Sequence, residues 1–302
     1  MPELPEVQTT VNDLLKLNIL GRAVKRITVT WPAVSGNISG QNLTRILRQR
    51  KIEGISRRGK FILFQFDDGS KGLMHLRMSG RLKFVRSNVP NGKHEHFKIL
   101  LDNGMELRLH DPRKFGRFTA DTTVEDKLKK LGIEPLSKAF TMSAISELLL
   151  NRRRQLKPLL LDQGVIAGLG NICVDESLWL ARLHPQRISA SLKKEEITRL
   201  KSGILRFLRS SIARGGTSLG DGEQNFVSVS SKAGDNQTRL NVYGRAGRPC
   251  RRCRQPLERI VVAQRGTYYC PRCQYRRGHR PCFAVAKSIE DRLRKGEPVA
   301  LT

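Results

Sequence analysis

The sequence predicts an α+β protein with several domains: an N-terminal helix with an antiparallel β-sandwich, then a helical domain, then a β-hairpin held by four cysteines. Three observations predict this order. Short β-type runs with tight turns fill the first part of the chain, helical spacing takes over after about residue 131, and cysteines in metal-ligand spacing lie near the end. We therefore expect domains at residues 1–131, 132–240 and 241–281, with a basic tail of unassigned role at 282–302.

The first helix is expected to begin almost at the start of the chain. Val7, Val11 and Leu14 recur at helical spacing, Pro5 suits a first turn, and Gly21 suits a stop. Residues 23–118 then favour short strands, such as the run Phe-Ile-Leu-Phe-Gln-Phe at 61–66. Hairpin turns are predicted at Asp-Asp-Gly (67–69) and Asp-Asn-Gly (102–104). Many short strands with close turns predict an antiparallel sandwich.

Helices are predicted at residues 142–150 and 193–213, where hydrophobic side chains recur every three or four positions. Between them lies a glycine-rich turn, Gly-Val-Ile-Ala-Gly-Leu-Gly-Asn, at residues 164–171. Such a turn lets backbone amides approach a ligand at a helix start, and phosphate is the ligand we expect there. Residues 215–237 are rich in Gly, Ser, Asn and Asp, which predicts a loop that joins the helices to the cysteine module.

The charge balance points to a polyanionic partner. Lys and Arg number 56 against 27 Asp and Glu, which gives +29, while a hydrophobic share of 38% is typical of a folded chain. Residues 156–169 form the most apolar stretch, and Lys157 and Asp162 interrupt it, so we expect no membrane span. The N-terminus lacks the features of a secretory signal. We therefore expect a cytoplasmic protein whose cysteines are thiols or metal ligands.

Four cysteines have the spacing of a metal site: Cys250-x2-Cys253-x16-Cys270-x2-Cys273. Four thiolates in tetrahedral geometry suit one structural Zn²⁺, and they leave no position for a catalytic water. Strands at 260–262 and 267–269 would form a hairpin with Arg265 near its tip. Between residues 245 and 280, Glu258 is the only acidic residue among many arginines. This favours phosphate contact over the alternative of a zinc ribbon that contacts protein.

The first residues, Pro-Glu-Leu-Pro-Glu, allow two interpretations. Structurally, they form a stiff arm before a helix. Chemically, Pro2 without Met1 is a secondary amine, and an ordinary α-amino group with a pKa of about 7.7–8.0 leaves free base at neutral pH. Such an amine can attack a sugar C1′ and become a permanently positive iminium, which accepts electrons in a later elimination. Glu3 is then placed to move protons.

The start of the chain, from Pro2 to Val7, resembles that of bacterial formamidopyrimidine-DNA glycosylases, which repair oxidised purines. Further motifs follow in the family's order: Arg-Gly-Lys-Phe (58–61), His-Leu-Arg-Met-Ser-Gly (75–80), Asp-Pro-Arg-Lys-Phe-Gly (111–116), Gly-Leu-Gly-Asn (168–171), Val-Tyr-Gly-Arg (242–245) and the cysteine quartet. The resemblance covers residues 2–273. It implies a bifunctional DNA glycosylase and AP lyase with one structural zinc ion and no ATP, nucleotide cofactor or catalytic metal.

The resemblance also implies roles for single residues near the reacting sugar. Pro2 would be the nucleophile, Glu3 the general acid and base, and Glu6 its support from the first helical turn. Lys60 would lie near the phosphate of the lesion and tune the amine. The alternative for Lys60 is one more surface lysine.

Other residues would hold the DNA. Asn171 would bind the phosphates from a helix-two-turn-helix element. Arg265, which we count among the catalytic residues, would bind them from the other side. Lys157 and His96 would also bind DNA. Glu176 would face the catalytic amine, or else lie on a helix surface.

A flipped nucleotide leaves a hole, which Met78, Arg113 and Phe115 would fill. Arg113 could donate hydrogen bonds to the orphaned cytosine. In the alternative, Met78 and Phe115 belong to the core and Arg113 is a solvated charge. Cys173 is expected to be a buried small residue, and Cys282 is unassigned.

The loop expected to cover the flipped base, at 215–240, departs from the family at residues 220–226, Gly-Asp-Gly-Glu-Gln-Asn-Phe. Two alternatives stay open. Leu-Leu-Leu-Asp-Gln at 159–163 is similar to the endonuclease VIII group, which removes oxidised pyrimidines, and a zinc protein could bind damaged DNA without catalysis. We expect the partner to be double-stranded DNA with oxidised bases or abasic sites, and the protein to act as a monomer.

Overall fold

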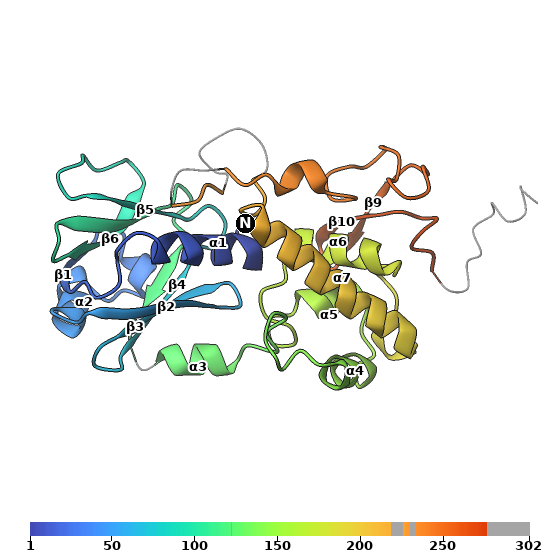
Figure 1. Ribbon diagram of the computed structural model, residues 1–302, viewed down its shortest axis with the longest axis horizontal. Coiled ribbons are helices and arrows are strands. Elements are labelled where there is room, and N and C mark those ends of the chain that lie inside the picture. Colours follow the sequence, from blue (N-terminus) through green and yellow to red (C-terminus); the bar gives the residue numbers. More distant parts are fainter. Residues whose placement is uncertain (122, 219–225, 230–232, 277–302) are drawn as a thin grey trace, which may run out of the picture. The chain divides into compact units, whose positions relative to one another are not determined.

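The computed structural model describes residues 1–276 except residues 122, 219–225 and 230–232 (Figure 1). Contacts within the chain form two compact units. The first unit comprises Met1–Thr141, Leu160–Cys173 and Leu205–Leu240, and the second comprises Met142–Leu159, Val174–Ile204 and the chain from Asn241 onward. The tail at 282–302 with Cys282, and part of the 215–240 loop, lie outside the described residues. The helical region expected at 132–240 contributes to both units.

Helix α1 (Leu4–Leu15) begins where the sequence predicts. Pro5 is tolerated in the first turn because the N–H groups there have no partner within the helix. Val7 and Leu14 are fully buried in the core of the first unit. The helix ends well before Gly21, which instead has a φ of +75° in a later turn, so the predicted stop at Gly21 is wrong.

Two four-stranded antiparallel sheets form the predicted sandwich, which is thereby confirmed. One sheet has the order β1 (Val24–Val29), β6 (Glu95–Leu101), β7 (Met105–His110), β5 (Arg81–Arg86), and the other has the order β2 (Ile52–Arg58), β3 (Phe61–Phe66), β4 (Lys71–His75), β8 (Arg117–Thr119). Residues alternate strictly between buried and half-buried along β6, as expected for a strand with one face in the core. Both predicted hairpin turns, at 67–69 and 102–104, are present.

Helix α2 (Gly40–Leu47), which the sequence did not predict, interrupts the strand region after the short helix η1 (Pro32–Ser35). Ser39 caps α2, since its hydroxyl accepts a hydrogen bond from the Asn42 backbone N–H at 3.2 Å. Leu43 and Leu47, four positions apart, are fully buried. Helix α3 (Thr123–Lys129) follows the sandwich.

The predicted helices at 142–150 and 193–213 are confirmed as α4 (Met142–Leu150) and α7 (Lys194–Ala213). The glycine-rich turn connects α5 (Leu156–Leu161) to α6 (Asn171–Ala181). Short helices η2 (Ser189–Ser191) and η3 (Asn236–Arg239) complete the helical elements of the described chain.

The second unit has its own small core, in which Trp179 packs with Val242, Leu257 and two of the quartet's cysteines, Cys250 and Cys270. The predicted hairpin is confirmed as β9 (Glu258–Val262) paired with β10 (Arg265–Tyr269). Arg265 pairs with Val262 directly beside the turn. In the described part of the chain, no helix is both long and apolar enough to cross a membrane.

Candidate active site and metal centre

The N-terminal arm packs against the glycine-rich turn within the first unit. Pro2 is buried, whereas Met1 keeps 46% of its surface exposed. The Leu4 N–H donates to the Gly168 carbonyl at 3.0 Å. A Cβ on Gly170 would lie 2.1 Å from the Glu3 carboxyl carbon, and one on Gly168 would lie 2.6 Å from Leu4 Cδ1. Only glycine at these two positions lets the arm approach so closely.

The Glu3 carboxylate occupies the start of α6. Its two oxygens accept hydrogen bonds from the backbone N–H groups of Ile172 and Cys173, each at 3.0 Å. These N–H groups have no partner within the helix, and they lie at its electropositive end. A carboxylate from a remote part of the same chain therefore satisfies these two amides, and phosphate binding at the turn itself, residues 164–171, stays a prediction.

Glu6 is a second buried carboxyl group beside the arm, with 4% of its surface exposed. It accepts hydrogen bonds from the Glu3 N–H at 2.8 Å and from the Thr217 N–H at 2.7 Å. Burial, and next the negative charge of Glu3, raise the pKa of Glu6 to about 7. Glu6 therefore holds a proton close to neutral pH, where an ordinary glutamate does not.

Lys60 lies in the turn between β2 and β3, and only 7% of its surface is exposed. The alternative of an ordinary surface lysine is wrong. Gly59 has a φ of +57°, and a Cβ on it would lie 3.6 Å from the Gly168 backbone nitrogen. The turn that carries Lys60 therefore lies beside the glycine-rich turn that holds the N-terminal arm.

Glu134, which the sequence did not mark as a site residue, holds the Lys60 turn in place. Its carboxylate accepts hydrogen bonds from Arg57 at 2.6 Å, from Arg58 at 3.1 Å and from the Gly59 N–H at 2.9 Å. Arg58 also donates to the carbonyls of Leu131 and Gly132. No local pattern marks Glu134, because its partners lie more than 70 residues away in the chain.

Asp111 joins the two loops that carry Met78 and Arg113. It accepts hydrogen bonds from the Ser79 hydroxyl at 2.6 Å, from the Arg113 N–H at 3.3 Å and from the Gly116 N–H at 2.6 Å. Because Asp111 is only 3% exposed, these bonds are protected from water. One buried carboxylate thus fixes both loops relative to each other.

Phe115 is 45% exposed, so the alternative that places it in the core is wrong. The Arg113 guanidinium lies 5.1 Å from the centre of the Phe115 ring. Met78 is half-buried. Lys114, with a φ of +58°, places its ammonium 4.5 Å from the Trp31 ring centre, which supports the loop from its other side.

His96 lies on β6, where its Nδ1 is 3.2 Å from the Thr30 hydroxyl. Its Nε2 has no hydrogen-bond partner among the residues that the structure describes. Burial, then the charges of Lys114 and His94, lower the pKa of His96. At neutral pH the ring therefore stays uncharged and can present one N–H donor.

Lys157, which the resemblance places near the phosphates as a DNA-binding residue, is fully buried in the second unit. Its ammonium lies 2.6 Å from Asp175 and donates to the Gly266 carbonyl at 3.0 Å. Asp175 also accepts a hydrogen bond from the Tyr268 N–H at 2.9 Å. Burial raises the pKa of Asp175 to about 7, and Lys157 opposes the rise. Direct phosphate contact by Lys157 is therefore wrong in this structure; the pair instead anchors strand β10 next to Arg265.

Glu176 is also fully buried, so its helix-surface alternative is wrong. Its carboxylate accepts hydrogen bonds from the backbone N–H groups of Asn241, Val242 and Tyr243, at 2.8–3.0 Å. The Asn241 side-chain amide adds another at 2.9 Å. With these donors on its oxygens, Glu176 shapes the backbone at 241–243.

Arg265 is exposed at the tip of the hairpin, and its guanidinium has no partner in the described part of the chain. Asn171 is the first residue of α6, in the first unit, and is partly exposed. Cys173, on the same helix, is 1% exposed, which confirms the prediction of a buried residue.

The four cysteines of the second unit meet at one point. Their sulfur atoms all lie within 4.8 Å of one another, and Cys253 and Cys270 are 3.4 Å apart. Ligand sulfurs around a tetrahedral Zn²⁺ are about 3.8 Å apart, given Zn–S bonds of about 2.3 Å. Trp179 Nε1 and the Arg252 N–H both donate to the Cys250 sulfur at 3.4 Å. Such donors stabilise a ligand thiolate, so the residues fit zinc.

Comparison with known families gives three consecutive matches. The profile of the Formamidopyrimidine-DNA glycosylase N-terminal domain matches residues 1–118, the profile of the Formamidopyrimidine-DNA glycosylase H2TH domain matches 131–222, and the Zinc finger found in FPG and IleRS matches 247–275. The zinc-finger match and the sulfur geometry together show that the cysteine quartet is a structural zinc site.

Curated relatives are similar in sequence to this protein over nearly the whole chain. The Formamidopyrimidine-DNA glycosylase of Herpetosiphon aurantiacus is 43% identical over 91% of this chain and 100% of its own length, and that of Protochlamydia amoebophila is 39% identical over 91% and 99%. Among solved structures, the MutM (Fpg) protein from Thermus thermophilus has a TM-score of 0.80 at 39% identity, covering 93% of this chain and 100% of its own.

A complex of the Lactococcus lactis Fpg with DNA containing an abasic site has a TM-score of 0.81 at 35% identity, covering 91% of this chain and 100% of its own. Identity at this level over this length, with all three profiles in order, excludes a chance likeness. This chain belongs to the formamidopyrimidine-DNA glycosylase family.

Proposed function

We propose that this chain is a bifunctional DNA glycosylase and AP lyase that removes oxidised purines, 8-oxoguanine and formamidopyrimidines, from duplex DNA in base-excision repair. The observation that carries the proposal is the N-terminal arm, which places Pro2 beside the buried Glu3 and Glu6 carboxyl groups. The curated relatives bear the name of this activity, and Lactococcus lactis Fpg is seen bound to Fapy-dG-containing DNA. The protein acts as a monomer on DNA in the bacterial cytoplasm.

Pro2 is the nucleophile once Met1 is removed, and the exposure of Met1 suits that removal. The lone pair of the Pro2 nitrogen forms a bond to C1′ of the damaged nucleotide. The electron pair of the glycosidic bond leaves with the base, which takes up a proton. The bonded nitrogen then gives its one proton to the Glu3 carboxylate, and the restored lone pair opens the sugar at O4′ to form an iminium. Because proline is a secondary amine, no proton remains on this nitrogen and the iminium keeps its positive charge.

Glu3 delivers the proton to O4′ as the ring opens and later takes part in removing the 2′ proton. Loss of the 3′ phosphate by β-elimination and of the 5′ phosphate by δ-elimination then leaves a one-nucleotide gap. Glu6, whose pKa is about 7, keeps a proton next to Glu3, so two adjacent negative charges are avoided near neutral pH.

Phosphates around the damaged nucleotide are bound by charged or N–H donors from four side chains: Lys60, Asn171, His96 and Arg265. Met78, Arg113 and Phe115 enter the space that the flipped nucleotide leaves. Asp111 supports this group by tying the two loops together.

Lys157 and Glu176 act indirectly. Lys157 positions the hairpin strand that carries Arg265, and Glu176 shapes the backbone at 241–243. The zinc ion holds the hairpin module and takes no part in the reaction. We retain residues 1–131, 132–240 and 241–281 as the functional modules.

Borohydride trapping tests the proposal. Protein without Met1 is incubated with a duplex that carries 8-oxoguanine opposite cytosine, next to the Pro2→Gly and Glu3→Gln variants, and the crosslinked peptide is sequenced by mass spectrometry. We expect an adduct on Pro2. An adduct formed only with an oxidised-pyrimidine duplex would move the chain to the endonuclease VIII type of activity. No adduct with either duplex would leave a DNA-binding zinc protein without catalysis.

A further inference from the structure

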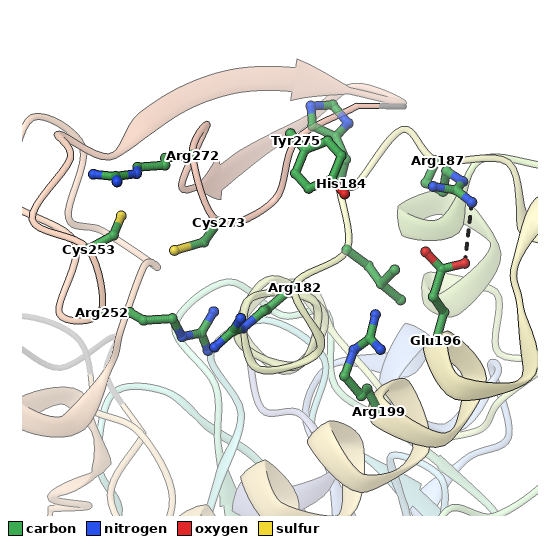
Figure 2. A pocket seen from close by; sticks show the side chains of 11 residues that line it. Arg182, His184, Arg187, Glu196, Arg199, Arg252, Cys253, Arg272, Cys273 and Tyr275 are labelled. Atoms are coloured by element: carbon green, nitrogen blue, oxygen red, sulfur yellow. Dashed lines mark hydrogen bonds and ion pairs between the residues drawn. The ribbon is translucent and has the colours of Figure 1, made fainter. Parts of the chain in front are cut away.

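The second unit contains a pocket of about 710 Å³ that none of the residues assigned to DNA repair chemistry lines (Figure 2). Its walls come from the end of α6, from α7, and from the two cysteine knuckles. Five arginines and one acidic residue supply its charge: Arg182, Arg187, Arg199, Arg252, Arg272 and Glu196. Figure 2 shows the ends of Arg182 and Arg252 close together, Arg199 extending from its helix, Arg187 turned toward Glu196, and Arg272 extending away from the other arginines.

Two of the arginines are held by the protein itself. Arg252 lies 4.1 Å from the centre of the Trp179 ring and donates to the Trp179 carbonyl at 3.2 Å. Arg187 lies 3.3 Å from Glu196 and donates to the Ser191 hydroxyl at 2.7 Å. These contacts keep both guanidinium groups in place before any ligand arrives, which lowers the entropy lost on binding.

The other three arginines have donors to spare. Arg182 and Arg272 are exposed, and the described part of the chain offers no acceptor to either side chain. Arg199 donates through Nε to the Ala181 carbonyl at 3.2 Å, which leaves its two terminal nitrogens for a ligand. Guanidinium groups with free N–H donors on the lining of one pocket suit the paired oxygens of phosphate.

The charge of the pocket requires an anion with at least two negative charges. The five arginines carry five positive charges, and Glu196 carries one negative charge. Four thiolates around one Zn²⁺ carry a net charge of −2, so a net charge of +2 remains. The volume lies within the range of about 300–1,000 Å³ for small-molecule sites. A DNA duplex cannot enter a space of this size, whereas a short run of phosphates can.

We propose that this pocket binds a compact cluster of phosphates, either a free oligophosphate or nucleotide, or the phosphorylated end of a single strand. Tyr275, 55% exposed on the lining, offers a ring face on which a base can stack. The site is independent of the glycosylase activity proposed above, because the only residues that it shares with the proposed enzyme are the zinc ligands Cys253 and Cys273, which take no part in the reaction.

Calorimetric titration of the zinc-loaded full-length protein tests the proposal, with inorganic triphosphate, ATP without Mg²⁺, and a 5′-phosphorylated dinucleotide as probes. The pocket variant carries Arg182→Gln and Arg272→Gln together. The matched control is Arg153→Gln, which removes an exposed arginine of the same unit outside the pocket. Zinc content and melting temperature check that each variant is folded.

We expect triphosphate to bind the wild type and the control equally within about twofold, and the pocket variant about tenfold or more weakly, as lost charge-assisted hydrogen bonds imply. Equal affinity for triphosphate and ATP would identify a free oligophosphate as the ligand. Tighter binding of ATP than of triphosphate would identify a nucleotide. Binding of the dinucleotide more tightly than either would identify the end of a strand. The proposal is overturned if no probe binds the wild type, or if the control loses as much affinity as the pocket variant.

Discussion

In the first unit the carboxyl groups of Glu3 and Glu6 are buried with backbone N–H groups as partners, whereas in the second unit Asp175 is buried against the ammonium of Lys157. Both arrangements satisfy a buried acid whose pKa burial raises to about 7, but the partners differ: neutral backbone N–H groups for Glu6, and a charged ammonium for Asp175. Burial and then the negative charge of Glu3 raise the pKa of Glu6, and its backbone donors oppose this rise only as neutral dipoles. Lys157 instead places a full positive charge 2.6 Å from Asp175, which opposes the rise in the pKa of that carboxyl group.

The difference matches the task of each region. In the proposed mechanism the acids beside Pro2 exchange protons with the substrate, and neutral amide partners permit that exchange. The pair beneath Arg265 must hold a strand still, because Lys157 and Asp175 bind the backbone at Gly266 and Tyr268. Four variants, ordered by the size of the expected effect, test this contrast.

Glu3→Gln should have the largest effect. Glutamine can still accept one N–H bond from the start of α6, but it cannot transfer a proton to O4′. We expect the rate of base excision under single-turnover conditions to fall about 10²–10⁴-fold. Glu53→Gln, an exposed glutamate on β2, serves as control and should change the rate little. An unchanged rate in Glu3→Gln would remove Glu3 from the proposed chemistry.

Asp175→Asn should have the next largest effect, on stability. It leaves the Lys157 ammonium buried without its counter-charge, which costs about 3–5 kcal/mol in comparable proteins. We expect a lower melting temperature and weaker DNA binding. The double variant Lys157→Met with Asp175→Leu should regain stability, but not DNA binding, because the Tyr268 N–H loses its acceptor. Recovery of both by the double variant would contradict the role of the pair as an anchor.

Glu6→Gln should change how stability depends on pH. Because the pKa of Glu6 is raised from 4.5 to about 7, the folded protein binds this proton more tightly than the unfolded chain does. The stability that it contributes is complete below pH 4.5 and is lost as pH rises through about 7, a change of about 3 kcal/mol. Melting temperatures between pH 5 and 8 should fall more steeply for the wild type than for the variant. Parallel curves would show that Glu6 does not titrate in this range.

Arg265→Ala should have the smallest effect. The side chain is exposed and makes no contact in the described protein, so its loss should leave stability unchanged. We expect the slope of log affinity for duplex DNA against log salt to decrease by about 0.9, as for one lost phosphate contact. Arg153→Ala provides the comparison for an arginine outside the hairpin. A slope that does not change would exclude a phosphate contact by Arg265.

Several features could be predicted from the sequence because their cause is local. Cysteine spacing predicts the zinc site, turn residues predict both sandwich hairpins, and apolar periodicity predicts α1, α4 and α7. Helix α2 was missed because its eight residues lie between strands and carry only two buried leucines. The sequence did not predict that Glu3 binds the first amides of α6, because a helix start can bind any anion and local sequence does not indicate which one.

By itself, then, the sequence determined the order of elements, the metal ligands and the residue types available for chemistry at Pro2 and Glu3. Only the tertiary structure decided which charged side chains became buried and which stayed exposed. It buried Lys157 and Glu176 and tied the Lys60 turn to Glu134, yet left Arg265 and Phe115 in solvent. The physical reason is that burial and charge pairing depend on segments far apart in the chain, and no local pattern records which of them will meet.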